Sequence, residues 1–104
     1  MITLTIFYPN SEGARFDMAY YLDVHMPMSK ERLGSALMGS TVDSGVMGGE
    51  QGAPPPYLVM THMRFESIET FLEAFMPHME ELQGDMPNYT NVQPQFQFST
   101  SQAI

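Results

Sequence analysis

Length, composition and charge set the first limits on this chain of 104 residues, which has twelve acidic and four basic side chains and no cysteine. The net charge of −8 disfavours binding to nucleic acid or to an anionic membrane, and the lack of cysteine excludes disulfides and thiolate chemistry, which fits a cytoplasmic protein. We expect a single domain, 1–104, with no membrane span, because no apolar run approaches the roughly 20 residues that a spanning helix needs.

A strand and an interrupted helix are predicted for the N-terminal third of the chain. Apolar and polar residues alternate over 2–8, a period of two that is typical of a strand. Asp17 offers a carboxylate that can cap the start of a helix. Pro27 disfavours helical geometry at the residue before it, so we expect the helix to break at about His25 and to resume over 29–37.

The middle of the chain is predicted to form two strands joined by a loop. Residues 39–47 are weakly strand-like, 48–56 (GGEQGAPPP) form the loop, and 57–65 (YLVMTHMRF) alternate strongly. One face of the later strand carries Leu58, Met60, His62 and Arg64. Whether this face meets the helices is open, so His62 is either a cavity residue or a residue of a dimer interface.

A second helix and a last strand complete the predicted elements. Ser67 is expected to cap the helix and Gly84 to end it, with Pro77 dividing it into two abutting segments. Residues 92–100 alternate again, with phenylalanines on one face and glutamines on the other. Pro94 indicates an edge position for the start of this strand.

The predicted order of elements is βαββαβ, which at this length is typical of the α+β, ferredoxin-like fold. In that fold the helices cover one face of a four-stranded antiparallel sheet and leave the other face bare. Here the bare face would carry apolar and amide side chains, and a large exposed apolar patch usually marks an interface. We therefore expect a homodimer that forms sheet to sheet.

Two segments resemble a known family. RFDMAYYLDVHMPM, residues 15–28, resembles the Phe-Asp-x-x-Tyr-Tyr-x-x-x-His-x-Pro-Leu signature of the EthD family, named for ethyl tert-butyl ether degradation, with Met28 in place of the usual Leu. DMPNYT, residues 85–90, is similar to the segment that precedes the last strand in that family. The loop 48–56 matches no family position. The resemblance implies that two ferredoxin-like subunits pair into a dimeric α+β barrel.

The resemblance also implies small-molecule chemistry. Related proteins of the same superfamily include lactone isomerases, cofactor-free oxygenases that act on polyketide anthrones, polyketide dehydratases and haem-degrading oxygenases. A small apolar organic ligand in bacterial catabolism or polyketide-type metabolism is therefore the expected partner. No cofactor is expected, because the sequence has no histidine pair with metal-ligand spacing and no Gly-rich phosphate loop.

His25 matches the histidine of the family motif and is the candidate general acid or base. Tyr21 lies four residues earlier on the same helix face and is the candidate hydrogen-bond donor to the substrate, whereas Tyr20 is expected in the core. The structural alternative is that His25 only bonds the carbonyls at a helix end. The residues expected to contact the substrate are Met28, His62, Phe75 and Tyr89, although Tyr89 can also plug the end of the core.

Two functions remain open at this point. The first is a cofactor-free isomerase, oxygenase or dehydratase with His25 as its acid or base. The second is a non-catalytic dimer that carries or sequesters an apolar ligand, or serves as an accessory protein. The eleven methionines suit either function, because methionine lines adaptable apolar surfaces.

Overall fold

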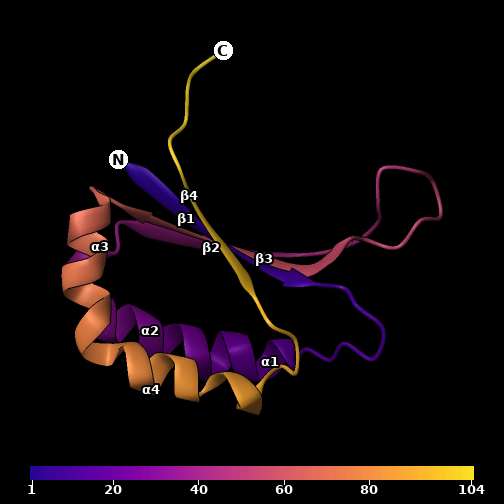
Figure 1. Cartoon of the computed structure of the whole chain (residues 1–104), viewed down its shortest axis with the longest axis horizontal. Coiled ribbons are helices and arrows are strands. Elements are labelled where there is room, and N and C mark those ends of the chain that lie inside the picture. Colours follow the sequence, from indigo (N-terminus) through magenta and orange to yellow (C-terminus); the bar gives the residue numbers. More distant parts are fainter.

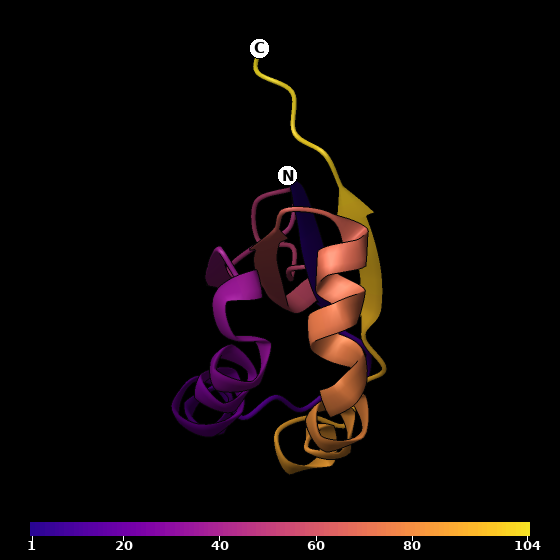
Figure 2. The same cartoon turned by 90° about the vertical axis from the view of Figure 1, so that its left-hand side faces the viewer.

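A four-stranded antiparallel sheet is the frame of the computed structural model, which describes all residues from 1 to 104. The strands lie in the order β2-β3-β1-β4 and comprise β1 (Ile2–Pro9), β2 (Gly39–Ser44), β3 (Tyr57–Phe65) and β4 (Gln95–Ser99). The helices all lie on one side of the sheet, and no helix covers the other side (Figures 1 and 2). The predicted α+β, ferredoxin-like order is confirmed.

The register between the strands decides which side chains face the helices. Leu4 of β1 pairs with Met63 of β3 on one side and with Phe98 of β4 on the other, and this row lies under the helices. The next row contains His62, which pairs with Thr5 of β1, and it lies on the open face. The alternation predicted for β3 is therefore confirmed, and the structure places His62 away from the helices.

The first helix does not break at His25, so that prediction is wrong. Helix α1 (Met18–Tyr20) continues through a π-helical turn (Tyr21–His25) into α2 (Met26–Leu33), and the Met26 N–H bonds to the Tyr21 carbonyl. Pro27 lies in the first turn of α2, just after this wider turn. A π turn inserts one extra residue and shifts the carbonyl that the proline ring would otherwise meet, which explains why the helix continues.

The ends of the helices follow the predicted capping residues. The Asp17 side chain accepts from the Tyr20 N–H, and the Ser67 side chain accepts from the Thr70 N–H at the start of α3 (Ile68–Phe75). A 3₁₀ turn that contains Pro77 joins α3 to α4 (Met79–Gly84), and a further 3₁₀ turn (Met86–Asn88) follows. Strand β4 lies at an edge of the sheet, as predicted, but it begins at Gln95, after Pro94, rather than at residue 92.

Two buried clusters fill the space between helices and sheet. One is purely apolar and contains Leu4, Leu33, Met63, Phe65 and Phe71. The other, next to the π turn, contains Tyr8, Tyr21, Met26, Val59 and Tyr89. Three phenols in one buried cluster are unusual for a plain core, because each hydroxyl needs a hydrogen-bond partner. No helix of the chain has both the length and the apolar character required to cross a membrane.

Candidate functional site

A cavity of about 220 Å³ lies between the sheet and the helices, where the two clusters meet. Side chains of β1, β3, β4 and the helices line it, and most of them are apolar. His25 enters from the π turn and is the only histidine of the lining, which contains no Asp, Glu, Lys or Arg side chain. The cavity is therefore a pocket for an apolar molecule with a histidine in its wall.

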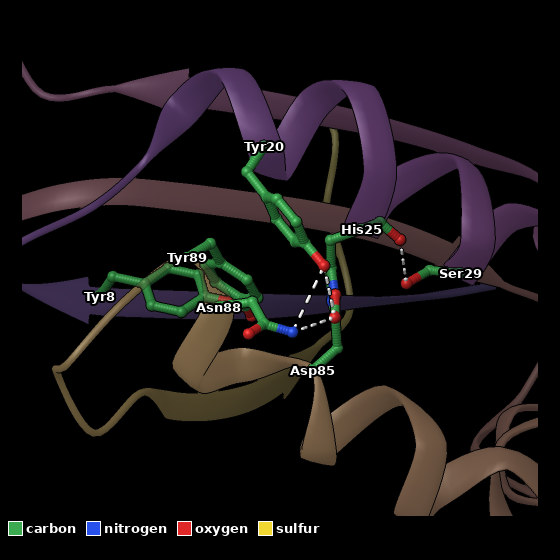
Figure 3. A network of polar contacts seen from close by, with 7 residues as sticks. All are labelled: Tyr8, Tyr20, His25, Ser29, Asp85, Asn88 and Tyr89. Atoms are coloured by element: carbon green, nitrogen blue, oxygen red, sulfur yellow. Dashed lines mark hydrogen bonds and ion pairs between the residues drawn. The ribbon is translucent and has the colours of Figure 1, made fainter.

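His25 is held by a carboxylate sixty residues later in the chain. Its Nδ1 lies 2.9 Å from Oδ2 of Asp85, which follows the last residue of α4 (Figure 3). The other carboxylate oxygen of Asp85 accepts from the Tyr20 hydroxyl at 2.7 Å and from Asn88 Nδ2 at 2.9 Å. Both side chains of the pair are nearly buried, so solvent screens this interaction little.

These contacts keep Asp85 ionised. Partial burial acts to raise the pKa of its carboxyl, but the hydrogen bonds from Tyr20, Asn88 and His25 outweigh burial and hold the pKa below its usual range. The same carboxylate raises the pKa of the Tyr20 hydroxyl that donates to it. A carboxylate accepts hydrogen bonds and cannot donate them, so the proton of the shared bond belongs to Nδ1 of His25.

The second ring nitrogen of His25 is free for a ligand. Nε2 has no hydrogen-bond partner within the chain, whereas Nδ1 is bound to Asp85. No fully buried side-chain nitrogen or oxygen lacks a partner, so Nε2 must be reachable by solvent or ligand. Since His25 lines the cavity, a molecule inside it can meet Nε2 directly.

Two tyrosine rings fix the orientation of the imidazole. The Tyr21 ring stacks on it with the centroids 5.4 Å apart and the planes 13° from parallel, and the Tyr89 ring lies 4.7 Å away. Ser29 donates its hydroxyl to the His25 carbonyl at 2.9 Å, one turn along the helix. The side chain is therefore held by its neighbours before any ligand arrives, as a preorganised site requires.

The hydroxyls of the buried tyrosines bond to partners inside the protein. Tyr8 and Tyr89 share a hydrogen bond of 2.9 Å, and Tyr21 bonds to Thr61 on β3 at 2.6 Å. Burial raises the pKa of all three phenols, so they stay neutral across the physiological range. Tyr21 therefore walls the cavity with its ring, while its hydroxyl points at the sheet rather than at a ligand.

The structure brings four of the six predicted site residues together. His25, Tyr21, Phe75 and Tyr89 all line the cavity. Met28 does not, because the continuous helix turns Met26 and Ser29 inward instead. His62 lies on the open face of the sheet, where its Nδ1 bonds to Thr5 and its Nε2 to Asp43.

Two residues of the site were not identified from the sequence. Tyr20 was expected in the core, but it is only half-buried and bonds to Asp85. Asp85 itself was missed as the partner of His25, although it lies in the second of the two segments that resemble the family. Those segments meet in space, since the Asp17 N–H bonds to the Tyr89 carbonyl at 2.7 Å and Phe16 pairs with Thr90.

A metal centre finds no ligand set in the chain. Nowhere do three or more His, Asp or Glu side chains gather as metal ligands do. The four contacts between an acidic side chain and a histidine or arginine are two separate His–Asp pairs and two glutamates that share Arg32. The chemistry that the site offers is therefore that of an oriented imidazole and neutral phenols.

Comparison with known proteins places the chain among similar structures. A crystal structure of an EthD-like protein from Ralstonia eutropha JMP134 has 47% sequence identity and a TM-score of 0.90, and the match covers 94% of this chain and 88% of that one. An EthD family protein from Bacillus halodurans shares the fold at 14% identity, with a TM-score of 0.64 over 98% of this chain and 99% of that one.

A third structure extends the fold to plants. A protein from Arabidopsis thaliana superposes with a TM-score of 0.70 at 12% identity, over 100% of this chain and 98% of that one. No protein among those with curated descriptions matches the chain significantly. The model of the EthD domain matches residues 13–93, which include His25, Asp85 and both tyrosine-bearing segments of the site. The chain therefore belongs to the EthD family.

Proposed function

We propose that the chain binds a small, largely apolar organic molecule in the cavity and that His25 moves a proton to or from it without a cofactor. The observation that carries this proposal is the asymmetry of the imidazole in a residue that lines an apolar cavity: Nδ1 is bound to the nearly buried Asp85, whereas Nε2 has no partner within the chain. An oriented histidine with a carboxylate behind it is the usual arrangement of a general base.

His25 and Asp85 have separate roles in this proposal. His25 accepts a proton at Nε2 in each of the reactions considered, which belong to catabolism or polyketide-type metabolism. An isomerase returns that proton to another atom of the same molecule, and a dehydratase gives it to the departing hydroxyl group, which leaves as water. In a cofactor-free oxygenase the carbanion left on the substrate reacts with dioxygen. Asp85 keeps the imidazole in one orientation and stabilises the imidazolium that forms. The walls of the cavity are mostly apolar, and electrostatic contacts beside apolar surfaces are stronger than the same contacts in water.

The alternative function is a carrier or accessory protein that holds the same ligand unchanged. The observation that favours it is the state of the phenols, since Tyr8, Tyr21 and Tyr89 already have partners within the protein. An enzyme that forms an oxyanion needs a donor aimed at it. Turnover therefore decides between the two functions, and binding alone does not.

The experiment is thermal melting of the wild type and of His25→Ala against small aromatic ketones, quinones, lactones and haem. A ligand at a hundred times its dissociation constant adds about 2.7 kcal/mol to the free energy of unfolding. In a domain of this size that corresponds to a shift of more than about 10 °C. Compounds that stabilise the wild type are then assayed for conversion by both proteins, with His62→Ala as the matched control on the opposite face of the sheet.

The outcomes separate the two functions. Conversion by the wild type and by His62→Ala, with none by the folded His25→Ala protein, supports catalysis by His25. Conversion that survives in His25→Ala contradicts it. Stabilisation without any conversion supports the carrier function, and no stabilisation by any compound contradicts the proposed apolar ligand.

We also propose that the chain forms a homodimer through the open face of the sheet, in the cytoplasm. Half-buried apolar side chains on that face, Phe7, Leu58 and Met60, support a protein partner. Arg64 on β3 and Asp43 on β2, which pairs with Met60, place opposite charges on that face, and such a pair can be self-complementary under a twofold axis. The lack of cysteine supports a reducing compartment. Light scattering tests the dimer, and cell fractionation of the native host tests the compartment.

A further inference from the structure

We infer that the cavity selects neutral, single-ring ligands that donate a hydrogen bond, such as phenols and stable enols, over ligands of the same shape that only accept one. This inference rests on the proposed function, because it names the class of molecule that the same cavity would take. Its basis is the fixed hydrogen-bonding character of each polar group in the wall.

The hydrogen bond to Asp85 determines the tautomer of His25. Asp85 is an acceptor only, and it receives hydrogen bonds from Tyr20 and Asn88 in addition to the bond from His25. A neutral imidazole carries one N–H, and Asp85 requires it at Nδ1. Nε2 then presents a lone pair to the cavity. A ligand that meets neutral His25 must supply the hydrogen of the bond.

The charges around the cavity determine which charge of ligand it favours. The other polar side chains of the lining are Ser29, Gln83 and the three tyrosines, and none of them is ionised at neutral pH. The nearest fixed charge is the Asp85 carboxylate behind the imidazole, and it is negative. An anion would lose its hydration without gaining a cationic partner, so the cavity favours a neutral molecule.

The phenols of the wall offer the ligand no donor that competes with this preference. Tyr8 and Tyr89 share a hydrogen bond, and Tyr21 bonds to Thr61. The Tyr8 hydroxyl also interacts with the hydroxyl of Tyr21, so the buried hydroxyls are partners for one another. The hydrogen bond that remains open to a ligand is therefore the one to Nε2 of His25. A hydroxyl on the ligand can donate to it, whereas an ether oxygen can only accept.

The volume of the cavity fits a ligand with one ring. A dry cavity of about 150 Å³ holds a benzene molecule. The cavity here has about 220 Å³ and aromatic walls that include Phe75 and Phe96. It therefore has room for one ring with a few substituent atoms.

The experiment compares three probes of matched shape by calorimetry on the full chain at pH 8. They are 4-methylphenol, its methyl ether 4-methylanisole, and the anion 4-methylbenzoate. We expect the phenol to bind about tenfold more tightly than the ether, the difference of a hydrogen bond in a dry site, and the anion not to bind. His62→Ala should retain the preference for the phenol.

Two variants test the origin of the preference. His25→Ala should bind phenol and ether equally, since the lone pair is gone. Asp85→Asn allows the opposite tautomer, because an amide can donate as well as accept, and the preference for the phenol should fall. Equal binding of phenol and ether by the wild type, or binding of the anion, overturns this inference and leaves the apolar cavity standing. No binding of any probe overturns the proposed function together with it.

Discussion

Nδ1 of His25 and Oδ2 of Asp85 lie 2.9 Å apart, although sixty residues separate them in the chain. One residue belongs to the π turn of the first helix and the other follows the last residue of α4, so the contact joins the two helical segments that lie over the sheet. Because each lies in one of the two segments that resemble the family motif, the pair accounts for why those segments carry polar residues at a buried position.

Asp85→Asn should change the tautomer of His25 and lower stability. In the wild type, the neutral imidazole of His25 is expected to carry its single proton on Nδ1. In the variant, both tautomers should be populated, and ¹⁵N chemical shifts of the imidazole distinguish them. The variant also loses the charge of a group that accepts three hydrogen bonds, so we expect its free energy of unfolding to fall by about 1.5–3 kcal/mol in urea. Asp43→Asn, next to His62, is the control and should leave the His25 signals unchanged. An unaltered Nδ1 proton in Asp85→Asn would contradict the assignment.

Stability should also fall at acid pH in a way that depends on Asp85. The pKa of this carboxyl is lower in the folded chain than its ordinary value of 3.8, so below neutrality the unfolded chain takes up the proton first. The stabilising contribution is complete above that ordinary value and is lost as the pH falls through it toward the folded pKa. The difference in unfolding free energy between wild type and Asp85→Asn should therefore narrow as the pH falls from 6 to 3. A difference that widens over this range would mean that the carboxyl binds its proton more readily when folded.

The tyrosine pair allows a double-mutant cycle. Tyr8→Phe or Tyr89→Phe alone leaves one buried hydroxyl without its 2.9 Å partner, which should cost about 1–3 kcal/mol. Removing both hydroxyls leaves no unpaired group, so the double variant should lose less than the sum of the two single losses. Urea unfolding of the four proteins measures the coupling. Additive losses would show that the two hydroxyls do not depend on each other.

The faces of the strands were predictable from the sequence because side chains alternate with a fixed period, and burial confirms the alternation of β3. The caps at Asp17 and Ser67 were predictable because capping is a local contact. The break at Pro27 was predicted wrongly, since a local rule for proline takes no account of a π turn that accommodates the ring. The same error led to the wrong expectation that Met28 contacts the ligand, because the continuous helix turns Met26 and Ser29 toward the cavity instead.

The hydrogen bond from His25 to Asp85 could not be predicted from local sequence patterns. Spacing along one helix predicts neighbours such as Tyr21 and His25, and their stacked rings confirm it. A contact between two helical segments far apart in the sequence depends on how the strands pair and how the helices pack on the sheet. The resemblance identified both segments and not the bond between them, so the role of Asp85 emerged only from the fold.

The homodimer gives the last prediction. Met60 lies near the centre of the open face, opposite Phe7 and Asp43 on the neighbouring strands. Met60→Asp would bury an unpaired charge in a sheet-to-sheet interface, which is far more costly than leaving it in water, so the variant should be a monomer by light scattering at micromolar concentration. Leu72→Asp on the exposed side of α3 is the control, since that side chain is 44% exposed and faces away from the sheet interface. A wild type that is already monomeric, or a Met60→Asp protein that stays dimeric, would show that the open face does not form the interface.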